Sequence, residues 1–121
     1  MQDRRGDLHR LSDMLTAMAK IRGFTRSGSD AFLSSAVTQD AVIRNFEVIG
    51  GAAGKVSTSL RSEHPEVPWS KMRGLASLAK HEYWRIDPHR IWASVEEIPR
   101  LESAITGIRA EQSKNERKRP K

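Results

Sequence analysis

Apolar side chains recur at steps of three and four along almost the whole chain, and this spacing constrains the fold more than any other feature. The first stripe contains Leu8, Leu11, Leu15 and Met18, which fall on one face of a helix because an α-helix has about 3.6 residues per turn. No segment alternates apolar and polar residues as a half-buried strand does, and no Asn-Gly hairpin turn occurs. The sequence therefore predicts an all-α protein.

The same spacing predicts four main helices joined by short loops. The first three cover about residues 5–23, 38–60 and 68–81, and a short extra helix near residues 29–33 is expected to bury two apolar side chains. Short connections between long amphipathic helices favour antiparallel neighbours. We therefore expect an antiparallel bundle of four main helices plus the short extra one.

Two prolines define the fourth helix. Asp87 is a preferred N-cap residue and Pro88 suits the first helical position, so this helix is expected to begin there. Pro99 is expected to end or kink it, because proline lacks a backbone N–H and its ring clashes with the preceding turn. The apolar stripe continues beyond Pro99 at Ile105 and Ile108, which predicts a last helical stretch.

The composition bounds the domain organisation and the class of function. The chain has 121 residues, enough for one domain, and no cysteine, which excludes disulfides, cysteine-ligated zinc and a thiol nucleophile. The net charge of +6 is concentrated at residues 113–121, which hold five basic side chains and one acidic one. We expect residues 1–112 to form one helical domain and residues 113–121 a basic, disordered tail that either contacts nucleic acid or only aids solubility. No uncharged stretch is long enough to span a membrane and the charged start is unlike a signal peptide, so we expect a cytoplasmic protein.

A run of glycine and alanine at residues 50–54 lies inside the second predicted helix. Three glycines there are unfavourable, because each mid-helix Gly costs about 1 kcal/mol relative to Ala. A phosphate-binding loop is excluded, because only three residues separate the outer glycines and Val56 occupies the place of the required Ser or Thr. We therefore expect another helix to pack closely against the face formed by Gly50 and Gly54, within the chain or from a second copy.

Candidate chemistry centres on the segment from His81 to Asp87. A zinc-protease motif needs a second His four residues after His81, where this chain has Arg85, so we expect no metal and no other cofactor. His81 ends a predicted helix, where it is either a capping residue followed by core aromatics or a general acid–base. Lys80, Arg85 and Arg90 flank it and can hold a phosphate. An acid–base and a cation are sufficient to cleave RNA through the ribose 2′-hydroxyl without a metal ion.

Six short segments carry a recognisable pattern in a fixed order. They are residues 38–50, 65–69, 72–75, 81–83, 86–87 and 91–92. Together they resemble the HepT-like HEPN-domain proteins, and the resemblance extends over about residues 5–110. It implies an all-α bundle that dimerises, with a metal-independent endoribonuclease site in the cleft between protomers. Members of this family are the toxins of bacterial toxin–antitoxin pairs, and their partner is a small MNT-type nucleotidyltransferase antitoxin.

The family motif consists of an Arg, a polar residue that is usually Asn, and then His, one residue and Tyr. His81 and Tyr83 match this motif, and the resemblance assigns His81 as the acid–base and Tyr83 as the hydroxyl to which the antitoxin transfers AMP. The positions of the motif Arg and of the polar residue are occupied by Ala76 and Ser77. Arg73 lies eight residues before His81, about 80° round an α-helix from it, so it is a poor substitute.

Two interpretations of the missing Arg remain open. Either the chain is an inactivated form, natural or engineered, or another cation such as Arg73, Lys80 or Arg44 replaces the motif Arg. The residues expected to support the site are Arg44, Asn45 and Glu47, which orient it, and Arg73, Lys80 and Arg85, which bind phosphate. For Glu47 the alternative is a solvent-exposed side chain with no part in the site.

The sequence supports hypotheses from different classes of function. The first is an RNA-cleaving toxin of the HepT type, either active or weakened. The second is a non-catalytic dimeric module that binds its antitoxin or nucleic acid, which the missing Arg favours. The third is a nucleotide-binding helper of a larger transferase, which predicts tight binding of free nucleotide.

Overall fold

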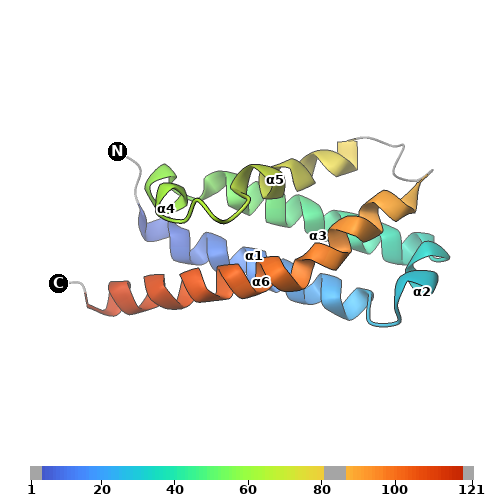
Figure 1. Ribbon diagram of the computed structural model, residues 1–121, viewed down its shortest axis with the longest axis horizontal. Helices are drawn as coiled ribbons and strands as arrows, with labels where there is room; N and C mark the ends of the chain where they lie inside the picture. Colours follow the sequence, from blue (N-terminus) through green and yellow to red (C-terminus); the bar gives the residue numbers. More distant parts are fainter. Residues whose placement is uncertain (1–3, 81–86, 119–121) are drawn as a thin grey trace.

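The computed structural model describes residues 4–80 and 87–118 (Figure 1). Within these residues every regular element is helical and no strand is present, which confirms the all-α prediction. The elements are η1 (Arg4–Gly6), α1 (Asp7–Phe24), α2 (Ser29–Leu33), α3 (Ala36–Lys55), α4 (Thr58–Glu63), α5 (Trp69–Gly74), η2 (Leu75–Lys80) and α6 (Pro88–Arg117). Among these helices, none is both long enough and apolar enough to cross a membrane.

The long helices α1, α3 and α6 lie side by side, and α5 with η2 forms a shorter row along α3 (Figure 1). α1 packs against both α3 and α6. Adjacent helices run in opposite directions. Asp7 at the start of α1 bonds to Ser57 just beyond α3. Arg22 near the end of α1 pairs with Glu102 at 2.6 Å, and Ser12 nearer its start accepts from Arg109, farther along α6, at 2.7 Å. The described part of the chain is thus an antiparallel helical assembly.

The apolar stripes of the long helices form one core. On α1 the fully buried side chains are Leu11, Met14, Met18 and Ile21, whereas Leu15 of the expected stripe is only partly buried. Met14 and Ile21, which lie beside the stripe in the sequence, thus belong to the buried face of α1, and this face packs against both α3 and α6. The core side chains from the other long helices are Val42, Phe46, Ile49 and Ala53 from α3, and Ile91, Val95, Ile98, Leu101, Ile105 and Ile108 from α6.

The second predicted helix is interrupted near its end. α3 stops at Lys55, Val56 is extended (φ −65°, ψ 140°), and Ser57 begins the separate helix α4 by accepting the Leu60 N–H. The cause lies far away in the chain, because the buried carboxylate of Asp7 accepts the Ser57 N–H at 2.8 Å and the Ser57 hydroxyl at 2.7 Å. The expectation of one continuous helix here is wrong.

The third predicted helix changes its pitch. It is α-helical as far as Gly74 and then continues as a 3-10 helix from Leu75 to Lys80. A 3-10 helix has about three residues per turn, so successive side chains are about 120° apart rather than 100°. The angle between Arg73 and His81 that an α-helix predicts therefore does not apply to this segment, and His81 itself lies outside the described residues.

Helix α6 continues through Pro99 without interruption. The expectation that Pro99 ends the helix is wrong, and the alternative of a kink agrees with the change of direction partway along α6 in Figure 1. The helix persists because Ile98 and Leu101, on either side of the proline, are both buried in the core. α6 also covers residues 113–117, where we expected the disordered tail to begin.

Candidate functional site

The 3-10 helix η2 carries the motif positions that the structure describes. Leu75 and Leu78 pack on the core, whereas Ser77 and Lys80 are exposed. This division follows from the 3-10 geometry, in which side chains three residues apart lie one above the other. η2 therefore has an apolar face toward the core and a polar face toward solvent.

The other two motif positions, His81 and Tyr83, lie outside the described residues, as does the expected phosphate ligand Arg85. Their expected roles as acid–base, modified hydroxyl and phosphate ligand stay predictions.

Ala76, at the position of the motif Arg, packs directly on Gly50 of α3. A Cβ atom placed on Gly50 would lie 2.5 Å from the backbone N of Ala76 and 2.7 Å from its Cβ. No side chain fits into that space, so only glycine allows η2 to approach α3 this closely. The predicted close packing of a helix is confirmed at Gly50, and the helix concerned belongs to the same chain.

The other two glycines of the run behave differently from Gly50. A Cβ atom on Gly51 would meet nothing within 4 Å, and one on Gly54 would meet only the Nε atom of Arg73, at 3.9 Å. Arg73 thus lies over Gly54, one helical turn along α3 from the contact between Gly50 and Ala76. The predicted close approach at Gly54 is a loose contact with one long side chain.

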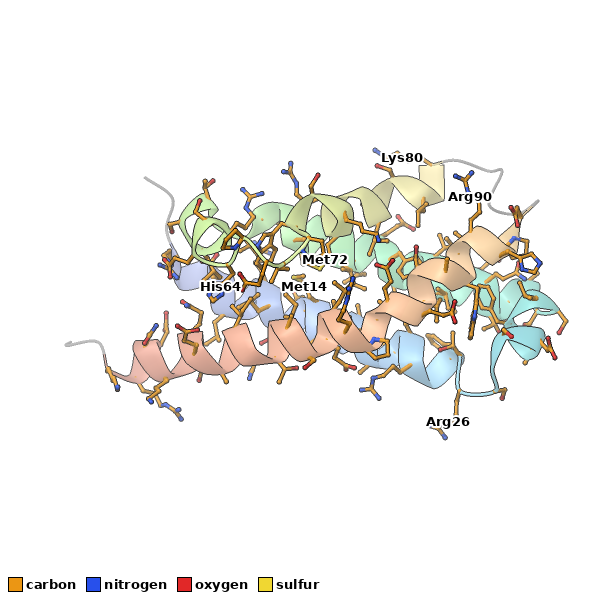
Figure 2. The ribbon with its side chains drawn as sticks, in the orientation of Figure 1. Met14, Arg26, His64, Met72, Lys80 and Arg90 are labelled. Carbon is orange, nitrogen blue, oxygen red and sulfur yellow. The ribbon has the colours of Figure 1, made fainter. Side chains whose placement is uncertain are left out.

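Two cations lie on the same edge of the molecule as the end of η2. Figure 2 shows Lys80 at the end of η2 and Arg90 near the start of α6, both at that edge. Both side chains are exposed. Lys71, earlier in the same row, is already paired with Glu97 at 2.6 Å, so the positive charge at this edge comes from Lys80 and Arg90, and it favours a negatively charged ligand.

The three residues expected to orient the site lie in different directions round α3. Asn45 is buried and its amide donates to the Ala41 carbonyl at 2.9 Å, within its own helix. It lies about 140° round α3 from Gly50, away from η2, whereas Glu47 lies about 60° from Gly50. Arg44 is 72% exposed and pairs with Glu47 at 3.9 Å. Of the three, only Glu47 lies toward η2.

A surface hollow between α1 and α3 was not anticipated from the sequence. It has a volume of about 310 Å³, and both helices contribute basic side chains to it, among them Arg10 and Lys55. The sequence did not indicate Arg10 as a site residue, because it is one of several charged residues on the polar face of α1. Within residues 4–80 and 87–118, no three His, Asp or Glu side chains lie close enough together to hold a metal ion.

Comparison with known proteins identifies the class to which this helical domain belongs. The profile of the family described as "Ribonuclease HepT-like" matches residues 14–108. A protein of Thermococcus cleftensis named "Probable ribonuclease HepT" is 35% identical over 101 residues, which cover 82% of this chain and 92% of that protein. No solved structure gives a significant match.

Two relatives from Methanocaldococcus jannaschii extend this result. "Putative RNase MJ0127" is 36% identical over 107 residues, covering 84% of this chain and 88% of that protein. "Putative RNase MJ1380" is 31% identical over 97 residues, covering 78% of this chain and 89% of that protein. The chain belongs to the HepT-like ribonuclease family of HEPN domains, which confirms the resemblance found from the sequence.

Proposed function

We propose that this chain is a metal-independent endoribonuclease, the toxin of a toxin–antitoxin pair, and that its activity is weakened by the replacement of the motif Arg. The observation that carries the ribonuclease proposal is the family match over residues 14–108. The relatives named as ribonucleases support it across most of their own length. The protein acts on RNA in the cytoplasm under this proposal.

His81 is the acid–base in this mechanism. It takes the proton of a ribose 2′-hydroxyl, and the resulting oxygen attacks the adjacent phosphorus to form a 2′,3′-cyclic phosphate. The bond to the 5′-oxygen breaks, and the protonated His81 returns its proton to that leaving oxygen. Negative charge accumulates on the phosphoryl oxygens in the transition state, so a preorganised cation is needed beside them. RNA that carries 2′-O-methyl groups should therefore resist cleavage.

With Ala76 in place of the motif Arg, the site lacks a guanidinium, which is the side-chain group best suited to stabilise that charge. A guanidinium donates paired hydrogen bonds that match two phosphoryl oxygens, whereas a lysine ammonium acts as a point charge. Loss of one preorganised donor of this kind typically lowers the rate by about 10²–10³. The exposed Lys80 and Arg90 can still attract RNA to this edge, so binding is expected to be retained better than turnover.

The proposed partners are a second copy of the chain and an MNT-type nucleotidyltransferase antitoxin. The antitoxin transfers AMP to Tyr83, which adds negative charge and bulk beside the site and repels RNA. Light scattering should show a dimer at micromolar concentration, and a monomer would contradict a site shared between protomers. A nucleotidyltransferase gene beside the gene for this chain would support the pairing.

Degradation of RNA by the pure protein tests the catalytic proposal. We expect slow cleavage of unmodified RNA, none of 2′-O-methyl RNA, and none by His81→Ala. Cleavage that persists in His81→Ala would remove His81 from its role.

A second function is favoured by Ala76 itself. A dimeric HEPN module without the motif Arg can bind its antitoxin or nucleic acid without cleaving RNA. The two proposals are separated by cleavage alone, since both predict dimerisation. No cleavage by this chain, together with cleavage by Ala76→Arg, would favour the non-catalytic module.

A further inference from the structure

The hollow between α1 and α3 is separate from the motif positions on η2. Its volume is about 310 Å³, and none of the residues that line it belongs to η2. The lining residues are Arg10, Asp13, Arg44, Glu47, Val48, Gly51, Ala52 and Lys55. The function proposed above makes no use of it.

Basic side chains lie in and beside the part of this hollow nearest the end of α3. Arg10 and Lys55 line it, and Arg73 reaches the same part of α3 from α5, where its Nε atom lies 3.9 Å from the Cβ position of Gly54. None of these three cations forms an ion pair or hydrogen bond with another residue that the structure describes. Two of these cations thus line the hollow and the third lies beside it.

The two acidic side chains in the hollow already have partners. Asp13 lies 3.5 Å from His9 on α1, a contact that is an ion pair only when the imidazole is protonated, and Glu47 pairs with Arg44 at 3.9 Å on α3. Arg10, Arg44 and Lys55 stand against these two acids, so the lining carries one net positive charge. Arg73, beside the hollow at Gly54, adds a second, and this balance favours a negatively charged ligand.

The exposed surface of α3 between these cations lacks side chains. Gly51 lines the hollow and Gly54 lies beside it, and both are exposed. Glycine inside a helix is unfavourable relative to alanine, and contacts within the chain explain it at Gly50 but not at Gly51, where a Cβ would meet nothing within 4 Å. These glycines leave room for a ligand to lie against the helix backbone.

We infer that the hollow binds the sugar–phosphate backbone of RNA. The inference rests on the proposed function for the identity of the ligand, and its charge and shape support it independently. Lys and Arg side chains supply most of the affinity for a nucleic-acid backbone by neutralising phosphates. A second copy of the chain is less suited to this surface, because a two-fold interface would place the same cations against each other.

The position of Arg73 connects the hollow to the motif positions. α3 and the α5–η2 row run antiparallel, since Arg73 lies at Gly54 and Ala76 at Gly50. A strand bound in the hollow and held by Arg73 therefore continues along η2 toward Ser77 and Lys80, which are exposed. The hollow is thus a path that leads RNA to the proposed cleavage site.

Substitutions at Gly54 test this inference by changing charge at one position. Binding is measured by fluorescence anisotropy with a short, single-stranded 2′-O-methyl RNA of mixed sequence, which should not be cleaved. Gly54→Glu places an acid beside Arg73, and we expect it to weaken binding at least about 10-fold at low salt. Gly54→Lys has similar bulk and the opposite charge, so it should bind as tightly as the unchanged chain or more tightly.

The matched control is Gly107→Glu, because Gly107 is also an exposed glycine inside a helix with nothing within 4 Å of its Cβ position. It should change the affinity less than about 2-fold. Lys55→Gln should reduce the slope of log affinity against log salt by about 1, whereas Lys20→Gln, on the exposed surface of α1 outside the hollow, should leave the slope unchanged.

Several results would overturn the inference. One is an equal loss of affinity in Gly54→Glu and Gly107→Glu, and another is the absence of any RNA binding by the unchanged chain. Conversion of a dimer to a monomer by Gly54→Glu in sedimentation would assign the hollow to a second copy instead.

The cleavage assay separates this inference from the proposed function. Binding that depends on Gly54 without any cleavage of unmodified RNA supports the hollow and rejects the catalytic proposal. If Gly54→Glu leaves the cleavage rate at subsaturating RNA unchanged, the binding of RNA in the hollow is rejected and the catalytic proposal is retained.

Discussion

Gly50 and Gly51 are adjacent in α3, but their substitution by alanine should change the free energy of unfolding in opposite directions. A Cβ on Gly50 would lie 2.5 Å from the backbone N of Ala76, 3.0 Å from its Cα and 2.7 Å from its Cβ, whereas a Cβ on Gly51 would meet nothing within 4 Å. Backbone atoms and a Cβ cannot rotate away, so Gly50→Ala requires η2 to move. Gly51→Ala adds a methyl group to open space.

The expected free energies of unfolding follow from two opposing contributions. Replacement of a mid-helix Gly by Ala stabilises by about 1 kcal/mol, and this gain applies at both positions. Overpacking costs about 1–3 kcal/mol, and Gly50→Ala falls at the upper end because all three of its nearest atoms belong to the rigid part of Ala76. We expect Gly50→Ala to be about 1–2 kcal/mol less stable than the unchanged chain and Gly51→Ala up to about 1 kcal/mol more stable.

Urea and thermal unfolding followed by circular dichroism measure this difference. A separation of about 2 kcal/mol between the two variants corresponds to about 8 °C in Tm for a domain of this size. In a Gly50→Ala background, Ala76→Gly should recover only part of the loss, because the contact with the backbone N at 2.5 Å remains. Equal stability of Gly50→Ala and Gly51→Ala would show that η2 does not rest on α3 at this point.

Three further substitutions test the fold and the proposed mechanism. Asp7→Ala should lower the free energy of unfolding by about 1–3 kcal/mol, because the buried N–H and hydroxyl of Ser57 lose their acceptor. Asp7→Asn keeps an acceptor oxygen and should lose less in urea unfolding, so an equal loss would contradict this role. Ala76→Arg should raise the rate of RNA cleavage about 10²-fold, and a gain that survives His81→Ala would contradict the assigned acid–base. Tyr83→Phe should abolish the mass increase that AMP transfer produces after incubation with the antitoxin and ATP, and an unchanged increase would exclude Tyr83 as the acceptor.

Local patterns predict the long helices of this protein well, because the burial of their stripes depends little on which neighbour covers them. Val42, Phe46 and Ile49 form one face of α3 whatever packs against it, and all three are fully buried. The helix start at Pro88 depends on the fixed backbone geometry of the proline itself, and α6 does begin there, although the Asp87 side chain makes no capping hydrogen bond to the described residues.

Features that depend on distant residues could not be predicted in this way. The end of α3 and the start of α4 depend on Asp7, which lies 50 residues before Ser57. The 3-10 pitch of η2 has no pattern of its own in the sequence, although Gly50 did indicate that some helix would come close. The hollow between α1 and α3 is lined by Arg10 from one helix and Lys55 from the other. Neither residue is unusual within its own helix, so neither pattern indicates the hollow.

The packing of η2 on α3 also distinguishes the cations that could replace the motif Arg. Arg73 lies against α3 at Gly54, whereas Ala76 lies against it at Gly50. The contact of Arg73 is therefore four residues, or about 6 Å along α3, away from the position of the motif Arg. Arg44 is 72% exposed and paired with Glu47, whereas Lys80 is exposed at the end of η2 and immediately precedes His81. Lys80 is therefore the best placed of the three, but its ammonium lacks the paired donors of a guanidinium. A site that relies on Lys80 should bind RNA and cleave it slowly, which is the behaviour proposed for this chain.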